Sequence, residues 1–489
     1  MGKEKSEINE KVIKFGTDGC RGIIADDFTV EKVKIITQGI CQYLKDKTLN
    51  EKKCPVVVVG YDTRFLSDRF AKTAADVLGA NNVRTYISTS FIPTPTLSTA
   101  VVKRRADLGI MITASHNPYY YNGYKVKGPY GSSATLDITS EIEKRVNQCI
   151  KDSISGKYYS DKNSGYGENV EEVDFTIDYK KHVLSLVDLD AIKNFNFKLL
   201  IDPMYGAAQN LYKNILEDIS PKRIVEIHAD LNPAFGGINP EPIGDNLNDA
   251  VSVLKKKECR LGICLDGDGD RVAALGEDGN FISSHHIFAV VLSHLVRNKK
   301  IRGKVVKTVS TSSIIDRICS RYGLELITTP IGFKYISEEI LAGGVVMGGE
   351  ESGGLWVEGN IPERDGMLMG LKLIEIVCKE SKTINKILEK IYEDFGYFVY
   401  ERRDYEVNIG QKEKLKAELT KKIPEILKRE GVKEVITIDG YKYIMADGSW
   451  LMIRPSGTEA VVRIYAESDS NGKLGRLHNL GKKLIKNIM

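Results

Sequence analysis

The sequence predicts an α/β protein in which three similar doubly wound α/β domains are followed by a smaller α+β domain at the C-terminus. Short apolar runs that suit buried strands, such as residues 55–60, alternate with segments of helical periodicity over most of the chain. This alternation recurs in three consecutive units of about 110–150 residues, which indicates an architectural repeat. Beyond residue 396, strand-like segments dominate, as is typical of an α+β domain.

The first predicted domain covers residues 1–160 and ends in a boundary segment, residues 153–169, that is rich in serine, glycine, lysine and aspartate. The spacing of apolar residues predicts three helices and three strands in this domain. The helices are expected at residues 29–44, 67–78 and 136–150, and the strands at residues 55–60, 83–87 and 108–112.

The second and third predicted domains cover residues 170–280 and 281–394 and continue the alternation of helix and strand. In the second domain, helices are expected at residues 177–187 and 247–256, and strands at residues 197–202, 224–227, 261–265 and 272–275. In the third domain, helices are expected at residues 287–295, 312–322 and 336–341, and strands at residues 305–309, 326–328 and 345–347.

The fourth predicted domain covers residues 396–489 and has the most strands for its length. Its strands are expected at residues 397–405, 435–438, 441–446, 450–453 and 461–466. Helices are expected at residues 411–429, with a break near Pro424, and at residues 473–488.

The composition is that of an ordinary globular protein, with 42% hydrophobic and 28% charged residues among 489. The 70 basic and 66 acidic residues leave a net charge of +4, too small for a whole-chain field that would attract nucleic acid or a membrane surface. No apolar stretch reaches the roughly 18 residues of a membrane span, and the N-terminus lacks a signal-peptide core. The eight cysteines form no Cys-x-x-Cys pair, which favours free thiols in a reducing compartment. We therefore expect a cytoplasmic protein.

A candidate nucleophile stands in the polar sequence Thr-Ala-Ser-His-Asn-Pro, residues 113–118, where a buried strand is expected to end. Ser115 offers a hydroxyl group, beside the imidazole of His116 and the amide of Asn117. A second turn is expected shortly afterwards, at Asn-Gly-Tyr-Lys, whose Lys125 would return a cation to the same place. Taken alone, such a segment is more often a polar surface turn.

A metal site is indicated by the sequence Leu-Asp-Gly-Asp-Gly-Asp-Arg at residues 265–271. The carboxylates of Asp266, Asp268 and Asp270 would repel one another without a cation, and hard oxygen ligands suit Mg²⁺ or Ca²⁺. A phosphoryl group on the serine hydroxyl would be a suitable further ligand, and Arg271 would stabilise its charge. An EF-hand is disfavoured because Arg271 stands where that loop requires glycine. A solvated acidic turn is the remaining alternative.

Two further glycine-containing loops follow expected strands. Glu350 and Ser352, in Gly-Gly-Glu-Glu-Ser-Gly-Gly, offer the acceptors that sugar hydroxyls need. The sequence Arg-Pro-Ser-Gly-Thr-Glu, which begins at Arg454, combines a guanidinium group, hydroxyls and exposed amides, as in a phosphate-binding nest. Either loop alone is also compatible with a surface turn. Turns elsewhere add the cations Arg21, Lys334 and Arg364.

Together and in this order, the motifs resemble those of the α-D-phosphohexomutase superfamily, which includes phosphoglucomutases and phosphomannomutases. Thr-Ala-Ser-His-Asn-Pro resembles the family's phosphoserine loop, Asp-Gly-Asp-Gly-Asp-Arg its metal loop, Gly-Glu-Glu-Ser-Gly its sugar loop and Arg-Pro-Ser-Gly-Thr-Glu its phosphate loop. Phe-Gly-Thr-Asp-Gly-Cys-Arg-Gly near the start matches as well. The resemblance spans nearly the whole chain. It implies four domains around a central cleft and an isomerase of carbohydrate metabolism that transfers a phosphoryl group between the 1- and 6-positions of a hexose phosphate.

The resemblance also implies roles for individual residues. It implies a phosphoprotein in which Ser115 carries the phosphoryl group, with Mg²⁺ as the metal and a hexose 1,6-bisphosphate as intermediate and activator. The implied metal ligands are Ser115, Asp266, Asp268 and Asp270. The implied catalytic residues are Ser115, His116, Lys125, Arg21, Asn117 and Arg271. The implied substrate-binding residues are Glu350, Ser352, Lys334, Arg364, Arg454, Ser456, Gly457 and Thr458.

Departures from the family's patterns leave the sugar open. Gly-Glu-Glu-Ser resembles the loop of glucose-preferring enzymes, but Gly353 replaces their aromatic residue, and Gly354 replaces the histidine of some dual glucose/mannose enzymes. We expect conversion of glucose 1-phosphate to glucose 6-phosphate, with a phosphomannomutase or a dual enzyme as the alternative. A phosphoglucosamine mutase, a metal-dependent sugar phosphatase and a non-catalytic binding protein are less favoured. The expected partner is a small-molecule sugar phosphate, without nucleic acid or membrane, and the chain is expected to be a monomer or dimer.

Overall fold

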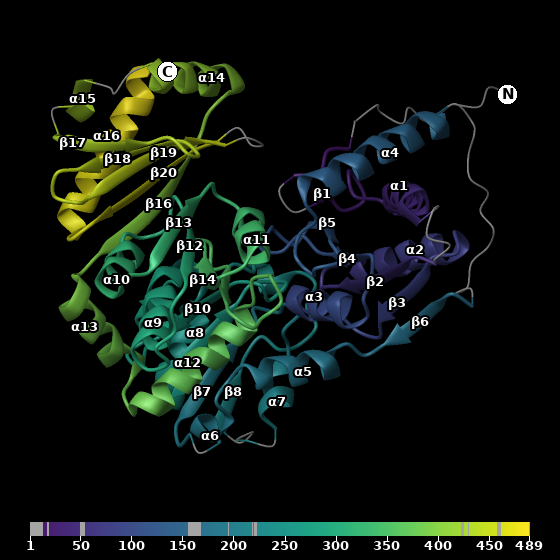
Figure 1. Ribbon diagram of the computed structural model, residues 1–489, viewed down its shortest axis with the longest axis horizontal. Coiled ribbons are helices and arrows are strands. Elements are labelled where there is room, and N and C mark those ends of the chain that lie inside the picture. Colours follow the sequence, from purple (N-terminus) through teal and green to yellow (C-terminus); the bar gives the residue numbers. More distant parts are fainter. Residues whose placement is uncertain are drawn as a thin grey trace. The chain divides into compact units, whose positions relative to one another are not determined.

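The computed structural model describes residues 13–16, 19–48, 54–154, 168–193, 195–217, 219, 223–421, 425–428, 430–456 and 461–488 (Figure 1). The chain divides into two compact units. The first unit comprises Met1–Phe281 and Gly359–Ser381, and the second comprises Ile282–Glu358 and Lys382–Met489. Among the described residues, no helix has the length and apolarity needed to cross a membrane.

The first sheet has six strands in the order β1-β5-β4-β2-β3-β6, with helices on both faces. Val57 and Val59 of β2 face the core shared with α1, α2 and α4, whereas Val58 faces the core shared with α3. This division follows from the alternation of side chains across a strand. The strands are β1 (Cys20–Ile23), β2 (Val56–Tyr61), β3 (Arg84–Ser88), β4 (Leu108–Ile112), β5 (Tyr121–Lys127) and β6 (Val170–Val173). The helices are α1 (Val30–Thr48), α2 (Ser67–Ala80), α3 (Thr94–Lys103), α4 (Leu136–Ile154) and α5 (Thr176–Ser185).

The second sheet, in the order β11-β10-β9-β7-β8, is also covered on both faces. Leu200 of β7 and Cys264 of β9 pack with Leu254 of α8, and α12 contacts β9 and β10. The strands are β7 (Lys198–Asp202), β8 (Ile224–Glu226), β9 (Cys259–Leu265), β10 (Val272–Leu275) and β11 (Phe281–Ile282). The helices are α6 (Leu189–Ile192), α7 (Leu211–Leu216), α8 (Asn248–Lys257) and α12 (Gly366–Glu380).

The second unit contains two sheets, in the orders β13-β12-β14-β15 and β16-β20-β19-β18-β17. The first of them consists of β12 (Lys304–Thr308), β13 (Glu325–Thr329), β14 (Val345–Gly349) and β15 (Leu355–Val357), with helices α9 (Ser284–Arg297), α10 (Ile314–Tyr322), α11 (Phe333–Ala342) and α13 (Ile384–Phe395). The other consists of β16 (Val399–Glu406), β17 (Val432–Ile436), β18 (Tyr441–Met445), β19 (Trp450–Pro455) and β20 (Val461–Ser468), with helices α14 (Ile409–Lys421), α15 (Glu425–Lys428) and α16 (Asn471–Ile488).

The predicted class, three similar α/β domains and a final α+β domain, is confirmed by the strand orders. The orders β5-β4-β2-β3, β10-β9-β7-β8 and β15-β14-β12-β13 repeat one topology. In each, the last three strands are parallel and the first is antiparallel to its neighbour. The final sheet is antiparallel throughout. The segments 113–120, 266–271 and 350–354 therefore occupy equivalent positions in the three repeats. Each of them joins a parallel strand to its antiparallel neighbour.

Two local predictions are corrected by the structure. Residues 122–125, predicted as a turn, lie within strand β5, which pairs with β1 and β4. Arg21, expected in a turn, lies in strand β1, which follows an isolated bridge between Gly16 and Gly19. Most of the predicted boundary segment, and residues 422–424 around the expected break at Pro424, lie outside the described residues.

Candidate active site

The first unit brings the loop after β4 against the loop after β9. Ser115 is buried, and its hydroxyl donates a hydrogen bond of 2.9 Å to Asp266 Oδ2. A Cβ atom on Gly267 would lie 2.6 Å from the main-chain oxygen of Ser115, so only glycine permits this approach between the two loops. The candidate nucleophile and the candidate metal loop, 151 residues apart in the sequence, therefore form one site.

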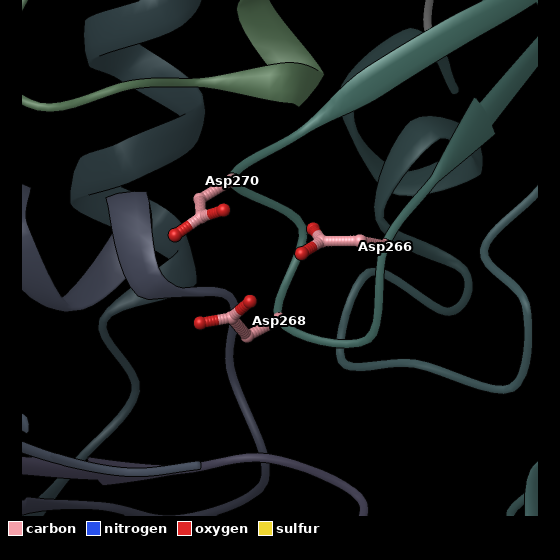
Figure 2. A group of neighbouring side chains, drawn as sticks. All are labelled: Asp266, Asp268 and Asp270. Carbon is pink, nitrogen blue, oxygen red and sulfur yellow. The ribbon is translucent and has the colours of Figure 1, made fainter. Parts of the chain in front are cut away.

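The three aspartates of the second loop are fully buried and face a common space (Figure 2). Asp266, Asp268 and Asp270 each offer an oxygen atom, and these atoms lie within 4.8 Å of one another. Within the described part of the chain, Oδ1 of Asp268 and Oδ1 of Asp270 accept no hydrogen bond, although both atoms are buried. Buried carboxylate oxygens without donors are expensive unless a cation binds them, so the residues fit a divalent metal such as Mg²⁺.

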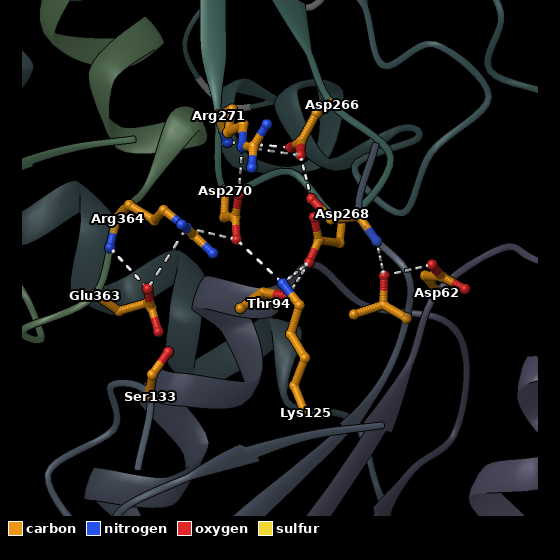
Figure 3. A network of polar contacts seen from close by, with 12 residues as sticks. Asp62, Thr94, Lys125, Ser133, Asp266, Asp268, Asp270, Arg271, Glu363 and Arg364 are labelled. Atoms are coloured by element: carbon orange, nitrogen blue, oxygen red, sulfur yellow. Dashed lines mark hydrogen bonds and ion pairs between the residues drawn. The ribbon is translucent and has the colours of Figure 1, made fainter. Parts of the chain in front are cut away.

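Three cationic side chains surround the aspartates (Figure 3). Lys125 Nζ lies 2.8 Å from Asp268 Oδ2 and 3.5 Å from Asp270 Oδ2. Arg364 Nε lies 2.8 Å from Asp270 Oδ2, and Arg271 Nε lies 3.9 Å from carboxylate oxygens of Asp266 and Asp270. These three cations partly offset the charge of the three carboxylates. A bound divalent cation would add positive charge, which a phosphoryl dianion would offset.

The buried aspartates differ in their pKa values. Burial and the charges of Asp270 and Asp268 raise the pKa of Asp266 well above its usual range. Burial would also raise the pKa of Asp268, but the charge and hydrogen bond of Lys125 and a 2.6 Å hydrogen bond from Thr94 hold it below its usual value. A cation bound at the three aspartates would favour the ionised form of Asp266, and this would lower its pKa toward that of Asp268.

The remaining candidate catalytic residues flank the same loop. Arg21 of β1 donates through Nη1 to the side-chain oxygen of Asn117. Burial and the neighbouring cations Arg271 and Arg21 lower the pKa of His116 well below its usual value. His116 is therefore a neutral imidazole near pH 7 and adds no positive charge to the site.

The second unit carries the other candidate substrate-binding residues. Glu350 and Ser352 lie between β14 and β15, where the adjacent Glu351 is held by hydrogen bonds of 2.6 Å from Ser310 and Ser284. Lys334 lies in α11.

The end of β19 forms a separate part of this unit. Arg454 Nε lies 3.0 Å from Asp439 Oδ1, and Ser456 is buried. Both residues border a cavity of about 860 Å³ that Lys412 and Lys416 of α14 also line. Gly457 and Thr458, also predicted to bind phosphate, lie outside the described residues.

The structure thus places the predicted residues in two groups. The group in the first unit contains Arg21, Ser115, His116, Asn117, Lys125, Asp266, Asp268, Asp270 and Arg271. Arg364, which was predicted to lie with the sugar-binding residues of the third domain, belongs to the first unit and contacts the metal loop. Glu350, Ser352, Lys334, Arg454 and Ser456 belong to the second unit.

Sequence reasoning missed several residues of the first group. Asp62 and Arg64 follow strand β2, and Thr94 begins α3 and contacts the metal loop. A polar pair directly after a buried apolar strand is a signal that could have identified Asp62 and Arg64. Thr94 carries no comparable local signal.

Comparison with known proteins agrees with this architecture. The four domain models of phosphoglucomutase/phosphomannomutase match residues 12–152, 177–279, 283–395 and 406–479. The chain is 30% identical to a phosphoglucomutase/phosphomannomutase of Thermococcus kodakarensis, with 97% of this chain and 99% of that protein covered. It is also 30% identical to a phosphoglucosamine/phosphogalactosamine mutase of Sulfurisphaera tokodaii, with 96% and 98% covered.

Solved structures give the same result. A crystal structure of a Thermus thermophilus protein assigned as a phosphomannomutase superimposes with a TM-score of 0.83 at 30% identity, covering 97% of this chain and 99% of that one. The similarity extends over all four domains, and a loop with a buried aspartate triad lies in the second of them. The chain therefore belongs to the phosphoglucomutase/phosphomannomutase family of the α-D-phosphohexomutase superfamily, and it is a phosphohexomutase.

Proposed function

We propose that this phosphohexomutase interconverts glucose 1-phosphate and glucose 6-phosphate through a phosphorylated Ser115 and a glucose 1,6-bisphosphate intermediate. The observation that supports this most directly is the position of Ser115 Oγ, which contacts Asp266 beside a buried cluster of carboxylates and cations. A hydroxyl so placed has the charge environment that a phosphoryl carrier needs, whereas hydrolase serines depend on an adjacent general base.

The charges around Ser115 suit phosphoryl transfer in both directions. In one direction, the bond between Ser115 Oγ and phosphorus breaks while a bond forms between phosphorus and the free hydroxyl oxygen of the substrate, and the proton of that hydroxyl is balanced by the proton that Ser115 Oγ takes up. The other direction reverses these changes. Lys125 and Arg271 stabilise the charge on the phosphoryl oxygens from fixed positions, which needs little reorganisation during the reaction. When bound at the aspartates, Mg²⁺ would supply further charge neutralisation there.

A glucosamine phosphate is the second candidate substrate. The Sulfurisphaera tokodaii relative acts on amino sugars by its name, and it is as similar to this chain as the Thermococcus kodakarensis relative. The Gly-Glu-Glu-Ser loop, which resembles that of glucose-preferring enzymes, supports glucose over the amino sugar.

The direct test supplies glucose, mannose and glucosamine 1-phosphates in turn, each with Mg²⁺ and a trace of the matching 1,6-bisphosphate. We expect the highest kcat/KM with glucose 1-phosphate, measured as 6-phosphate formation by ³¹P NMR. The same spectra report free phosphate, and its release in excess of isomerisation would indicate a phosphatase instead. The Ser115→Ala variant should lose nearly all turnover; retained activity would remove Ser115 from the proposed role.

A further inference from the structure

A buried arginine outside the predicted site holds the loop that carries Ser115. Arg64 lies in the turn between β2 and α2, and its side chain is 0% exposed. Its guanidinium group donates to four main-chain carbonyls of one loop. Nη2 donates to the oxygens of Ser115 (2.5 Å) and Asn117 (2.6 Å), and Nη1 donates to those of Pro118 (2.9 Å) and Tyr121 (3.1 Å).

The partner of Arg64 holds the other side of the same serine. Asp62 Oδ2 lies 3.2 Å from Arg64 Nε and accepts a hydrogen bond of 2.6 Å from the hydroxyl of Thr113. The hydroxyl oxygen of Thr113 accepts in turn the main-chain N–H of Ser115, at 2.9 Å. The carbonyl of Ser115 is therefore tied to Arg64 directly, and its amide is tied to Asp62 through one hydroxyl.

Ser115 needs this support because its backbone is strained. Its φ angle is 54°, in the left-handed region that is unfavourable for a residue other than glycine. Such a conformation persists where the surroundings determine it, and it often occurs at functional sites. Here it directs the hydroxyl toward Asp266, while the carbonyl oxygen accepts a hydrogen bond from Arg64 and leaves no room for a Cβ atom on residue 267.

We infer that Arg64 and Asp62 form a positioning pair that holds Ser115 in the backbone conformation from which its hydroxyl exchanges the phosphoryl group. Arg64 has no exposed surface for a phosphate group, and its donors are directed at carbonyls, so its role is exerted through the loop. The inference rests on the proposed function of Ser115 as the phosphoryl carrier.

Three variants test the pair. Arg64→Gln removes most of the carbonyl contacts, Arg64→Lys keeps the charge, and Thr113→Val removes the link to the amide of Ser115 without unpairing a buried charge. The control is Arg104→Gln, because Arg104 is half-buried, stacks 4.5 Å from the ring centre of Tyr86 in the same unit, and precedes β4, whereas the loop that carries Ser115 follows this strand.

The decisive measurement is the single-turnover rate constant for phosphorylation of Ser115 by glucose 1,6-bisphosphate, followed by intact-mass spectrometry. Misplacement of a reacting group by about 1 Å can cost about 100-fold in rate, so we expect about a 100-fold loss in Arg64→Gln, a smaller loss in Thr113→Val and partial recovery in Arg64→Lys. If a substitution only reduced the fraction of correctly folded protein, a smaller fraction of the protein would become phosphorylated, and the rate constant would be unchanged.

Two outcomes separate the inference from the proposed function. If wild type is phosphorylated and active while Arg64→Gln and Thr113→Val keep the wild-type rate constant, the positioning pair is refuted alone. If wild type itself takes up no phosphoryl group and does not isomerise the sugar phosphates, the proposed function fails and the inference fails with it. Should Arg64→Gln not fold, Thr113→Val decides the question.

Discussion

At the residue scale, the site is dominated by buried charge. Asp266, Asp268 and Asp270 would destabilise the fold if they stood alone, because an unpaired buried carboxylate costs several kcal/mol. Lys125 and Arg364 offset part of this cost, and two carboxylate oxygens remain without hydrogen-bond donors in the described structure. Binding of a cation at these aspartates would therefore also stabilise the fold around them.

Asp268→Asn should weaken both metal binding and catalysis. The amide keeps the shape of the side chain but removes one of three negative charges, so we expect at least about a 100-fold loss in kcat and a higher Mg²⁺ requirement. Initial rates measured against Mg²⁺ concentration give both quantities. The control is Asp249→Asn in α8, since the side chain of Asp249 is 83% exposed and should leave the Mg²⁺ dependence unchanged. An Asp268→Asn enzyme with the wild-type Mg²⁺ dependence would contradict the metal site.

Residues could be predicted from the sequence where their chemistry is local. The Asp266 to Asp270 loop was evident because alternating carboxylates and glycines admit few interpretations. The role of Arg64 could not be predicted, because its partners are main-chain carbonyls about 50 residues later in the chain. A pattern of side chains in the sequence does not indicate such contacts. Arg364 was identified as a cation, but only the fold shows that it contacts Asp270.

At the element scale, the sequence predicted most of the helices and strands whose apolar residues lie on one face of the element. Strand β5 was mistaken for a turn because Asn122-Gly123 is a common turn dipeptide. Gly123 instead permits close contact, since a Cβ atom there would lie 2.5 Å from the main-chain oxygen of Thr113. Helix α12 was missed because its residues from Gly366 to Val377 are all buried, which leaves no polar face to reveal the helical period.

Asp365 caps the N-terminus of α12 and makes the stability of this helix depend on pH. Its side chain accepts hydrogen bonds of 2.9 Å from the amide of Leu368 and 2.8 Å from the hydroxyl of Tyr179. Burial raises the pKa of Asp365 to about 6. Because this exceeds the value of the unfolded chain, the native state binds more protons between about pH 4 and about pH 6, and stability should fall as the pH rises through that window.

The Asp365→Asn variant tests this pH dependence because it keeps the acceptor but cannot titrate. We expect wild type to lose stability relative to this variant as the pH rises from about 4 to about 6, by at most about 1.4 kcal/mol per pH unit. Urea unfolding midpoints at several pH values give the difference. Thr383→Ala, which removes the cap of α13, is the non-titrating control and should give a constant offset. A constant difference between wild type and Asp365→Asn would show that folding does not raise the pKa of Asp365.

At the scale of the whole molecule, the chain is a threefold repeat with a fourth domain added. The loops that carry Ser115, Asp266 and Glu350 occupy equivalent positions in the three repeats, yet each supplies a different chemistry. The repeat was predictable from the rhythm of strands and helices. The grouping into two units could not be predicted in this way. The segment Gly359–Ser381 belongs to the first unit, although the residues before and after it in the sequence belong to the second.

This grouping gives the two units different spectroscopic signatures. Both tryptophans, Trp356 and Trp450, are buried in the second unit, and the aspartate triad lies in the first. Because a ligand stabilises the part that binds it, Mg²⁺ should raise the unfolding midpoint of the first unit. At about 100 times its dissociation constant the stabilisation is about 2.7 kcal/mol.

We therefore expect thermal unfolding followed by tryptophan fluorescence and by far-ultraviolet circular dichroism to disagree once Mg²⁺ is present. The dichroism reports both units and should gain a transition at higher temperature, whereas the fluorescence reports the second unit and should move little. Asp268→Asn should abolish the shift, which separates binding at the triad from a general effect of salt. Coincident transitions that move together with Mg²⁺ would show that the two units unfold as one, and a shift that survives Asp268→Asn would place the cation elsewhere.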